Sequence, residues 1–304
     1  MDRIPTVAWT ILKRTYGEFQ QDDCLQMAAA LAYYTIFSLP PLLVIIISIA
    51  GLQLGEEAVQ GRVEQEIEQI IGAEAAEQVQ TMISNASQSL SEEGSIWTGI
   101  LGIGALLFGA TGAFAQLQKA LNRAWSVQPG RSGILNFLLK RALSFGMIVT
   151  TGFLLLVSLA LSTLLTAIGS ELQTWIPGFP LSLTKVLDVA LSLTVITALF
   201  AAIFRILPDA RINWRDVFTG AAVTALLFVA GKTLIGFYLG QSDPGSMFGA
   251  AGSLALVLLW IYLSAVLLLL GAEFTQVWAR RHGKSIRPSS GAVSVVREIR
   301  EDPS

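Results

Sequence analysis

Residues 248–277 read FGAAGSLALVLLWIYLSAVLLLLGAEFTQV and contain a single charged side chain, Glu273. The hydrocarbon core of a bilayer is about 30 Å thick and a helix rises about 1.5 Å per residue, so about 20 apolar residues are enough to cross it. A soluble protein would still have to cover its surface with polar groups, which this stretch lacks. It therefore predicts a transmembrane helix.

Five further stretches have the same character, and the composition of the chain agrees with them. Of its 304 residues, 53% are apolar and only 14% are charged, whereas a typical soluble domain has about 25% charged residues. The predicted fold class is all-α: a polytopic membrane helix bundle in which residues 1–304 form a single membrane domain. The six predicted spans are residues 27–54, 96–117, 143–168, 181–207, 217–239 and 248–277.

Lysine and arginine are concentrated in every second connection between these spans. Seventeen of the 20 basic residues lie before span one, between spans two and three, around the junction of spans four and five, or after span six. Because basic connections stay in the cytoplasm, we predict a multi-pass membrane protein with both termini cytoplasmic. Trp125, Trp214 and Trp278 are then expected at the inner membrane interface. The first 24 residues mix both charges, and no cleavable signal peptide is predicted.

Two segments outside the spans have a distinct composition. Residues 55–95 contain nine glutamates and one arginine, with apolar residues at helical spacing. They predict an acidic outer cap of two amphipathic helices, which serves either as a solvated cover or as a gate or recruitment surface. Residues 279–304 predict a basic cytoplasmic tail, mostly disordered, whose first part rests on anionic lipid.

Charged side chains inside a span are costly, so each is a functional candidate. Asp188 and Lys232 lie at similar depths from the outer ends of spans four and five, and Lys185 is one helical turn from Asp188. They predict a polar site for an ion or an anionic headgroup; alternatively, the lysines extend toward the interface and Asp188 balances them. Arg205 and Glu273, near the cytoplasmic ends of spans four and six, predict a structural ion pair.

Pro40 and Pro41 lie in the middle of span one. Proline lacks a backbone N–H and clashes with the preceding helical turn, so a kink or a break is expected there. Freed carbonyl groups at membrane depth need partners, which Tyr33, Tyr34 and Ser38 are placed to supply. These residues predict either a discontinuous helix that lines a substrate path or a purely structural kink.

Span two has a face of small residues. Ala105, Gly109 and Ala113 recur every four residues, and small side chains let two membrane helices approach closely. This face predicts a helix contact. A nucleotide-binding loop is not expected, because no strand precedes the glycines and the third glycine of the motif is missing.

The residue inventory argues against an enzyme. The chain has one cysteine, Cys24, and one histidine, His282 in the basic tail. Zinc hydrolases need clusters of histidine, cysteine or carboxylate ligands, and serine hydrolases of the Gly-x-Ser-x-Gly type need a histidine base. We therefore expect no catalytic activity, no metal, no cofactor and no nucleic-acid partner.

Three segments carry a family resemblance: residues 28–41 (AAALAYYTIFSLPP), residues 207–216 (LPDARINWRD) and residues 252–273, which begin GSLA and end GAE. On these motifs the chain resembles the YihY/BrkB family of bacterial inner-membrane proteins over nearly its whole length. The resemblance implies six membrane helices. Family members are labelled virulence factors or ribonuclease BN, and some relatives are associated with movement of lipid or lipid-linked material across the inner membrane. Lys232 and Glu273 match recurrent family positions.

The ribonuclease label does not fit a chain without an aqueous nuclease site. The leading hypothesis is a transporter or flippase-like protein for an amphipathic or anionic substrate such as a lipid. The main alternative is a non-transporting membrane scaffold for envelope or virulence machinery, suggested by the outer cap; an intramembrane enzyme is a third. Expected partners are membrane lipids and a lipid or anionic small-molecule substrate, and a homo-oligomer is compatible with the sequence.

Overall fold

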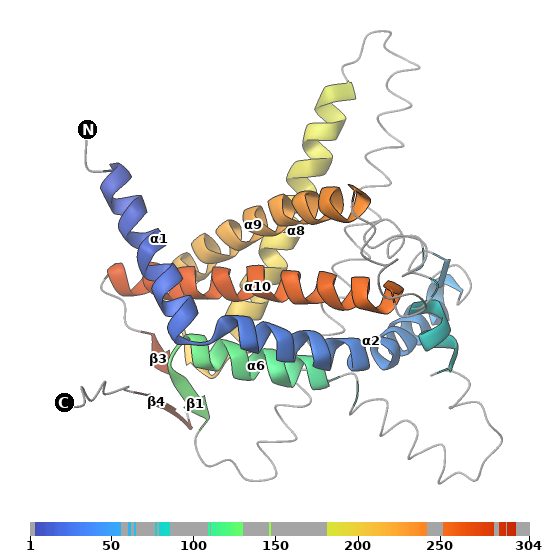
Figure 1. The fold of residues 1–304 in the computed structure, drawn as a ribbon, viewed down its shortest axis with the longest axis horizontal. Helices are drawn as coiled ribbons and strands as arrows, with labels where there is room; N and C mark the ends of the chain where they lie inside the picture. The colour runs from blue at the N-terminus through green and yellow to red at the C-terminus, as the bar shows by residue number, and fades with distance from the viewer. Residues whose placement is uncertain are drawn as a thin grey trace.

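The computed structural model of the chain describes residues 4–55, 60, 61, 64, 77, 79–85, 109, 111–129, 146, 181–241, 252–282, 286–289 and 291–295. This part of the chain is mostly helical (Figure 1). The helices are α1 (Ile4–Gln21), α2 (Cys24–Leu54), α6 (Gly112–Ala124), α8 (Leu181–Ile206), α9 (Trp214–Gln241) and α10 (Gly252–Arg281). The short strands are β1 (Val127–Pro129), β2 (Ala210–Arg211), β3 (Arg287–Pro288) and β4 (Ala292–Ser294).

Four of the described helices contain a stretch that is long and apolar enough to cross a membrane. The four stretches are Cys24–Ile45 in α2, Val189–Ile206 in α8, Trp214–Gly231 in α9 and Leu254–Arg281 in α10. They overlap predicted spans one, four, five and six, and large apolar side chains on their surfaces are exposed, as contact with lipid requires. Predicted spans two and three lie mostly outside the described residues, so a total of six spans stays a prediction.

Helix α10 is the centre of the described bundle. It packs against α9, α2 and α1, while α8 packs against α9 and α6 packs against α2. Figure 1 shows α2, α6 and α10 side by side, with α1 crossing them near one end. α1 therefore lies against the end of the bundle and is not a further parallel member.

Two glycine–threonine pairs bring α9 and α10 into close contact. A Cβ atom on Gly220 would lie 1.9 Å from Oγ1 of Thr275, and one on Gly271 would lie 2.0 Å from Oγ1 of Thr224. Each threonine hydroxyl donates to the carbonyl of the glycine on its own helix, at 2.7 Å. Each helix thus offers its glycine to the threonine of the other, and both buried hydroxyls keep a partner.

The two prolines of span one lie inside α2, which is one helix from Cys24 to Leu54, so the first of the two alternatives, a discontinuous helix, is not what the structure has. A role of these residues in a substrate path stays a prediction. The small face of span two makes room for them, because a Cβ atom on Gly109 would lie 3.2 Å from Cγ of Pro41. This confirms the predicted helix contact at Gly109. Ser38 does not serve a freed carbonyl of α2 here; its Oγ accepts the N–H of Ala113 at 3.1 Å, one of the N–H groups that the first turn of α6 leaves without a helical partner.

Helix α6 extends beyond the predicted end of span two, from Gly112 to Ala124. Its last turns place Ala120, Leu121 and Ala124 in the core, so packing continues the helix after the apolar stretch has ended. Trp125, predicted at the membrane interface, is only 2% exposed and donates its indole N–H to the carbonyl of Ala272 at 3.2 Å. Its ring packs edge to face against Phe204 of α8, so Trp125 faces the bundle and not lipid; its depth relative to the membrane interface stays a prediction.

The segment after α10 is more ordered than predicted. β3 pairs antiparallel with β2 (Ala210 opposite Pro288), and β4 pairs antiparallel with β1 (Gln128 opposite Val293). The prediction of a mostly disordered tail is therefore wrong for residues 286–289 and 291–295. The backbones of the connections after α6 and α8 offer edges that this segment can pair with, which satisfies hydrogen-bonding groups on both sides.

Few residues of the predicted outer cap are described. Residues 79–85 are helical, and Val79 and Ile83 are buried in one cluster with α2 residues such as Val44 and with Val257 of α10. This segment packs on the bundle. The other residues of the predicted cap lie largely outside the described part of the chain.

Candidate functional site

The ends of six helices meet at one end of the bundle. Cys24 at the start of α2 contacts Glu273 near the end of α10, Arg123 near the end of α6 contacts Asp23, and Asn122 contacts Asp209 just after α8. The start of α9 and the end of α1 lie at this same end. We call it the basic end, because most of the described arginines lie in these helix ends or in the segments next to them: Arg123, Arg205, Arg211, Arg215, Arg280, Arg281 and Arg287.

The basic end also contains a group of acids, which we call the acidic cluster: Glu18 of α1, Asp22 of the turn after α1, and Glu273 of α10. Carboxylate oxygens of the three residues all lie within 4.8 Å of one another. Asp22 is 3% exposed and Glu273 is 0% exposed, while Glu18 is partly buried. Residues 255 positions apart in the chain thus share one site.

The turn between α1 and α2 makes this convergence possible. The N–H of Asp22 still donates to the carbonyl of Glu18, at 2.9 Å, which keeps both carboxylates on the last turn of α1. Asp23 then adopts a left-handed backbone conformation with φ 53° and ψ 42°, which aspartate and asparagine tolerate better than most residues. This residue reverses the chain, so that Cys24 begins α2 beside α10.

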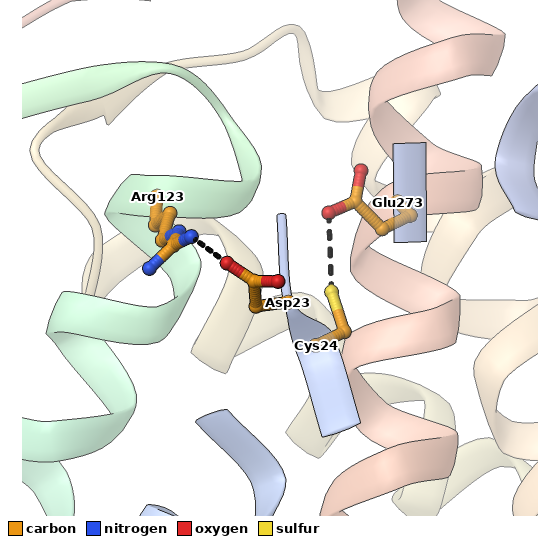
Figure 2. Close-up of polar contacts among 4 residues, drawn as sticks. All are labelled: Asp23, Cys24, Arg123 and Glu273. Carbon is orange, nitrogen blue, oxygen red and sulfur yellow. Dashed lines mark hydrogen bonds and ion pairs between the residues drawn. The ribbon is translucent and has the colours of Figure 1, made fainter. Parts of the chain in front are cut away.

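Figure 2 shows how the charges at this turn are distributed. The thiol of Cys24 donates to Oε1 of Glu273 at 3.5 Å, while Arg123 contacts Asp23 at 2.5 Å. Arg280 contacts Glu18 at 3.2 Å. Oε2 of Glu273 is buried and has no hydrogen-bond partner among the described residues. Arg123 is therefore engaged by Asp23, and Arg280 pairs with Glu18 of the acidic cluster.

This arrangement brings three carboxyl groups together, and those of Asp22 and Glu273 are buried. Carboxylates that share a site disfavour each other's ionised form, and a buried charge without a partner is strongly destabilising. The cluster is therefore suited to holding an additional positive charge, either a proton or a metal cation.

The structure gives Arg205 and Glu273 different partners, and no ion pair joins them in the described part of the chain. The Arg205 guanidinium donates to the carbonyl of Ile212 and lies over the ring of Trp214, 5.4 Å from its centroid. Arg205 thus closes the loop between α8 and α9, while Glu273 faces α1.

The other predicted site residues are placed only in part. Asp188 and Lys185 lie in α8 and Lys232 lies in α9, but their side chains are outside the described part of the structure, so the predicted polar site stays a prediction. Tyr33 and Tyr34 are exposed and pack edge to face against each other.

A second polar cluster at the basic end was missed by the sequence reasoning. The side chain of Asn122 donates to Oδ2 of Asp209 at 2.9 Å and accepts the N–H of Asp209 at 2.7 Å. The carbonyl of Asp209 accepts the N–H of Ser289 at 2.9 Å. We call these three residues the amide network; it fastens the loop after α8 to α6 and to the C-terminal strands. Asp209 lies within the motif of residues 207–216, which was its only signal in the sequence.

Comparison with known proteins supports one family. The family model described as virulence factor BrkB matches residues 15–294. The "UPF0761 membrane protein" of Saccharophagus degradans is 28% identical over 88% of this chain and 59% of its own length, and that of Pseudoalteromonas atlantica is 28% identical over 85% and 82%. The "UPF0761 membrane protein" of Pseudomonas aeruginosa is 30% identical over 86% of this chain and 62% of its own length.

The chain thus spans about three fifths of the length of several relatives, 59% of the first and 62% of the Pseudomonas aeruginosa protein. No solved structure matches it. The family match covers the second part of α1, all later described helices and strands, and all three residues of the acidic cluster. The chain therefore belongs to the virulence factor BrkB family of membrane proteins.

Proposed function

We propose that the protein is a transporter or flippase-like protein for an amphipathic or anionic substrate such as a lipid. It acts in the bacterial inner membrane with the basic end in the cytoplasm, and it catalyses no chemical conversion. The observation that supports this most is Glu273, a fully buried carboxylate within a candidate span, beside two further carboxylates.

A buried carboxylate is a costly feature, since the penalty for burying one ion amounts to several kcal/mol. Ionisable residues inside membrane spans accordingly mark ion or substrate pathways in many membrane proteins. A site that takes up and releases positive charge favours different arrangements of α1 and α10 in its two states, and transport requires such alternation between states. A static scaffold gains nothing from this arrangement.

The predicted polar site of Asp188, Lys185 and Lys232 supplies the substrate side of the proposal. Lysine side chains bind phosphate groups as point charges, and lipid headgroups carry such groups. Lys232 also matches a recurrent position of the family that the chain resembles. Lys232 is predicted near the outer side of the membrane, whereas the acidic cluster lies at the basic end. The polar site and the acidic cluster would therefore face different ends of one pathway.

Reconstitution into liposomes tests the proposal. The full-length protein is reconstituted with a fluorescent phospholipid, and the movement of lipid between leaflets is followed together with an ion-flux dye. We expect the wild type to move lipid or ions, and Glu273→Gln and Lys232→Ala each to lower the rate. Asp23→Asn, which changes a carboxylate next to the cluster but outside it, serves as the matched control and should retain the wild-type rate.

Two results would contradict the proposal: no movement of lipid or ions by the wild type, or a rate that neither Glu273→Gln nor Lys232→Ala changes. Affinity capture from membranes then addresses the scaffold alternative. A reproducible set of envelope proteins that is retained by Glu273→Gln would favour the scaffold.

A further inference from the structure

We propose that the acidic cluster is a binding site for a divalent cation with a preference for oxygen ligands, of the class of Mg²⁺, Mn²⁺ and Ca²⁺, held between α1 and α10 by Glu18, Asp22 and Glu273. Binding of the ion does not depend on the proposed function; only a role of the ion in transport rests on it. Three independent features of the described residues carry the inference: distance, charge and unpartnered polar groups.

The distances fit one ion. The carboxylate oxygens of the three residues all lie within 4.8 Å of one another. Mg²⁺ and Ca²⁺ bind oxygen at about 2.0–2.6 Å, so two ligands on opposite sides of one ion are about 4–5 Å apart. A single ion among the three oxygens can therefore contact all of them without a rearrangement of the helices.

The charges fit a divalent ion. Glu18, Asp22 and Glu273 contribute three negative charges when ionised, and Arg280, which contacts Glu18 at 3.2 Å, contributes one positive charge. Arg123 is engaged by Asp23 outside the cluster. Because affinity for hard divalent cations rises with the number of charged ligands, three carboxylates favour such an ion.

Further unpartnered polar groups lie one helical turn from the cluster residues. Besides Oε2 of Glu273, both side-chain amide atoms of Gln276 and the hydroxyl of Thr15 are buried without a hydrogen-bond partner among the described residues. Gln276 is 0% exposed and Thr15 is 2% exposed. Gln276 lies one turn after Glu273 on α10, and Thr15 lies one turn before Glu18 on α1, so each shares a helix face with a cluster residue.

Buried polar groups in native proteins almost always have partners. Side-chain carbonyl and hydroxyl oxygens of this kind complete the coordination of hard cations or hold the water that such ions keep. The thiol of Cys24 is the donor in its contact with Glu273, so it acts as a partner that orients a ligand. The donor set is thus oxygen, which favours Mg²⁺, Mn²⁺ or Ca²⁺ over softer metals.

The position of the ligands gives the ion a structural consequence. Glu18 and Asp22 come from α1 and the turn after it, whereas Glu273 comes from α10. A bound ion therefore fastens α1 to α10, and its loss leaves carboxylates facing each other across that contact. The ion is expected to govern whether α1 stays packed on the end of the bundle.

Direct metal binding tests the inference without any transport measurement. The full-length protein is stripped with a chelator, placed in nanodiscs of zwitterionic lipid, and titrated with MnCl₂ while free Mn²⁺ is followed by electron paramagnetic resonance. We expect one tight site per chain. Thermal unfolding should shift upward by on the order of 5 °C when the Mn²⁺ concentration is about 100 times the dissociation constant, and MgCl₂ or CaCl₂ should compete.

Variants connect the binding to the cluster. Glu273→Gln and Asp22→Asn should each weaken Mn²⁺ binding about tenfold or more, because affinity at such sites follows the number of charged ligands. Asp23→Asn should bind Mn²⁺ like the wild type. The inference is overturned if the wild type binds no Mn²⁺, or if neither cluster variant weakens the binding; Asp22→Asn decides the question if Glu273→Gln does not fold.

The two proposals fail separately. Tight Mn²⁺ binding that both cluster variants weaken, in a protein that moves neither lipid nor ions, supports the cation site and contradicts the proposed function. Transport that depends on Glu273 in a protein without Mn²⁺, Mg²⁺ or Ca²⁺ binding supports the function and contradicts the cation site.

Discussion

The basic end of the bundle contains two polar clusters, and they differ in whether their groups have partners. In the amide network, Asn122 and Asp209 exchange two hydrogen bonds, and Ser289 adds a third. In the acidic cluster, Oε2 of Glu273 is buried and has no hydrogen-bond partner among the described residues, while Arg280 contacts Glu18. The two clusters lie at the same end of the molecule and are both largely buried.

The difference separates a structural role from a functional one. A fully paired polar network holds a loop in place and gains nothing from a ligand. A buried carboxylate oxygen without a partner, such as Oε2 of Glu273, is a standing cost to the fold unless something binds there. The amide network accordingly fastens the loop of residues 207–213, and the acidic cluster is the place to look for the ion.

The largest effect is expected at Gly271, which lies two residues before Glu273 on α10. A Cβ atom on Gly271 would lie 2.0 Å from Oγ1 of Thr224, so Gly271→Ala forces α9 and α10 apart. The next two residues supply the acceptor for Trp125 and the carboxylate of Glu273, so the packing of Trp125 and the acidic cluster are both displaced. We expect a loss of about 3 kcal/mol in the free energy of unfolding, measured by denaturant titration in detergent, and weaker Mn²⁺ binding.

Gly17→Ala is the matched control, because a Cβ atom on Gly17 of α1 has no neighbour within 4 Å. Alanine in a helix interior is favoured over glycine, so this variant should be as stable as the wild type or more stable by about 1 kcal/mol. Equal stability of Gly271→Ala and Gly17→Ala would show that the contact of α9 and α10 is looser than described.

The second-largest effect is expected from a substitution that changes the amide network alone. Asn122→Ala removes two hydrogen bonds of Asp209, one of them to a carboxylate, and should lower the free energy of unfolding by about 2–3 kcal/mol. Mn²⁺ binding by the folded protein should be unchanged, because the acidic cluster keeps its residues. Gln20→Ala, which removes an exposed hydrogen bond to Tyr16, should change stability by about 0.5 kcal/mol or less. A loss of Mn²⁺ binding in Asn122→Ala would show that the amide network and the acidic cluster are coupled and are not two separate clusters.

Glu273→Gln should change the free energy of unfolding in the opposite direction from Asn122→Ala, although both residues are buried. In chelator-treated protein the neutral amide removes repulsion with Asp22 and Glu18, so the free energy of unfolding should stay equal or rise by about 1 kcal/mol. Thermal unfolding in the presence of a chelator measures this change. A loss as large as that of Asn122→Ala would mean that the fold already compensates the charge of Glu273.

The spans were the most predictable part of the molecule. Long apolar stretches in lipid have to be helical, because every backbone polar group must be satisfied within the segment; stretches of α2, α8, α9 and α10 meet the criteria for a span. Helix α1 and the extension of α6 to Ala124 were not predicted, because packing on α10, not hydrophobicity, decides their extent. The same holds for β3 and β4, whose pairing partners are far away in the chain.

The candidate site was only partly predictable. Glu273 stood out as the single charge in its stretch, but arginine was the obvious partner for it, and Arg205 instead serves the Ile212 carbonyl. Glu18 and Asp22 looked like ordinary charges of a polar N-terminal segment. Nothing local in the sequence indicates that the turn at Asp23 carries them to residue 273, and for the same reason no metal site was expected.

The smallest effect comes from the neighbour of Asp22 and gives the sharpest form of the comparison. Asp23 and Arg123 make an ion pair whose side chains are 55% and 41% exposed, and such pairs contribute about 0.5 kcal/mol or less. Asp23→Asn keeps a residue that tolerates the left-handed backbone, so thermal unfolding and Mn²⁺ binding should both remain close to wild type. Asp23→Ala should be less stable than Asp23→Asn by about 1 kcal/mol, because both variants lack the charge but alanine tolerates the left-handed backbone conformation less well than asparagine. Asp22→Asn, one residue away, should leave the turn intact and weaken Mn²⁺ binding. Equal Mn²⁺ affinity of Asp22→Asn and Asp23→Asn would contradict the assignment of Asp22 as a ligand in the acidic cluster.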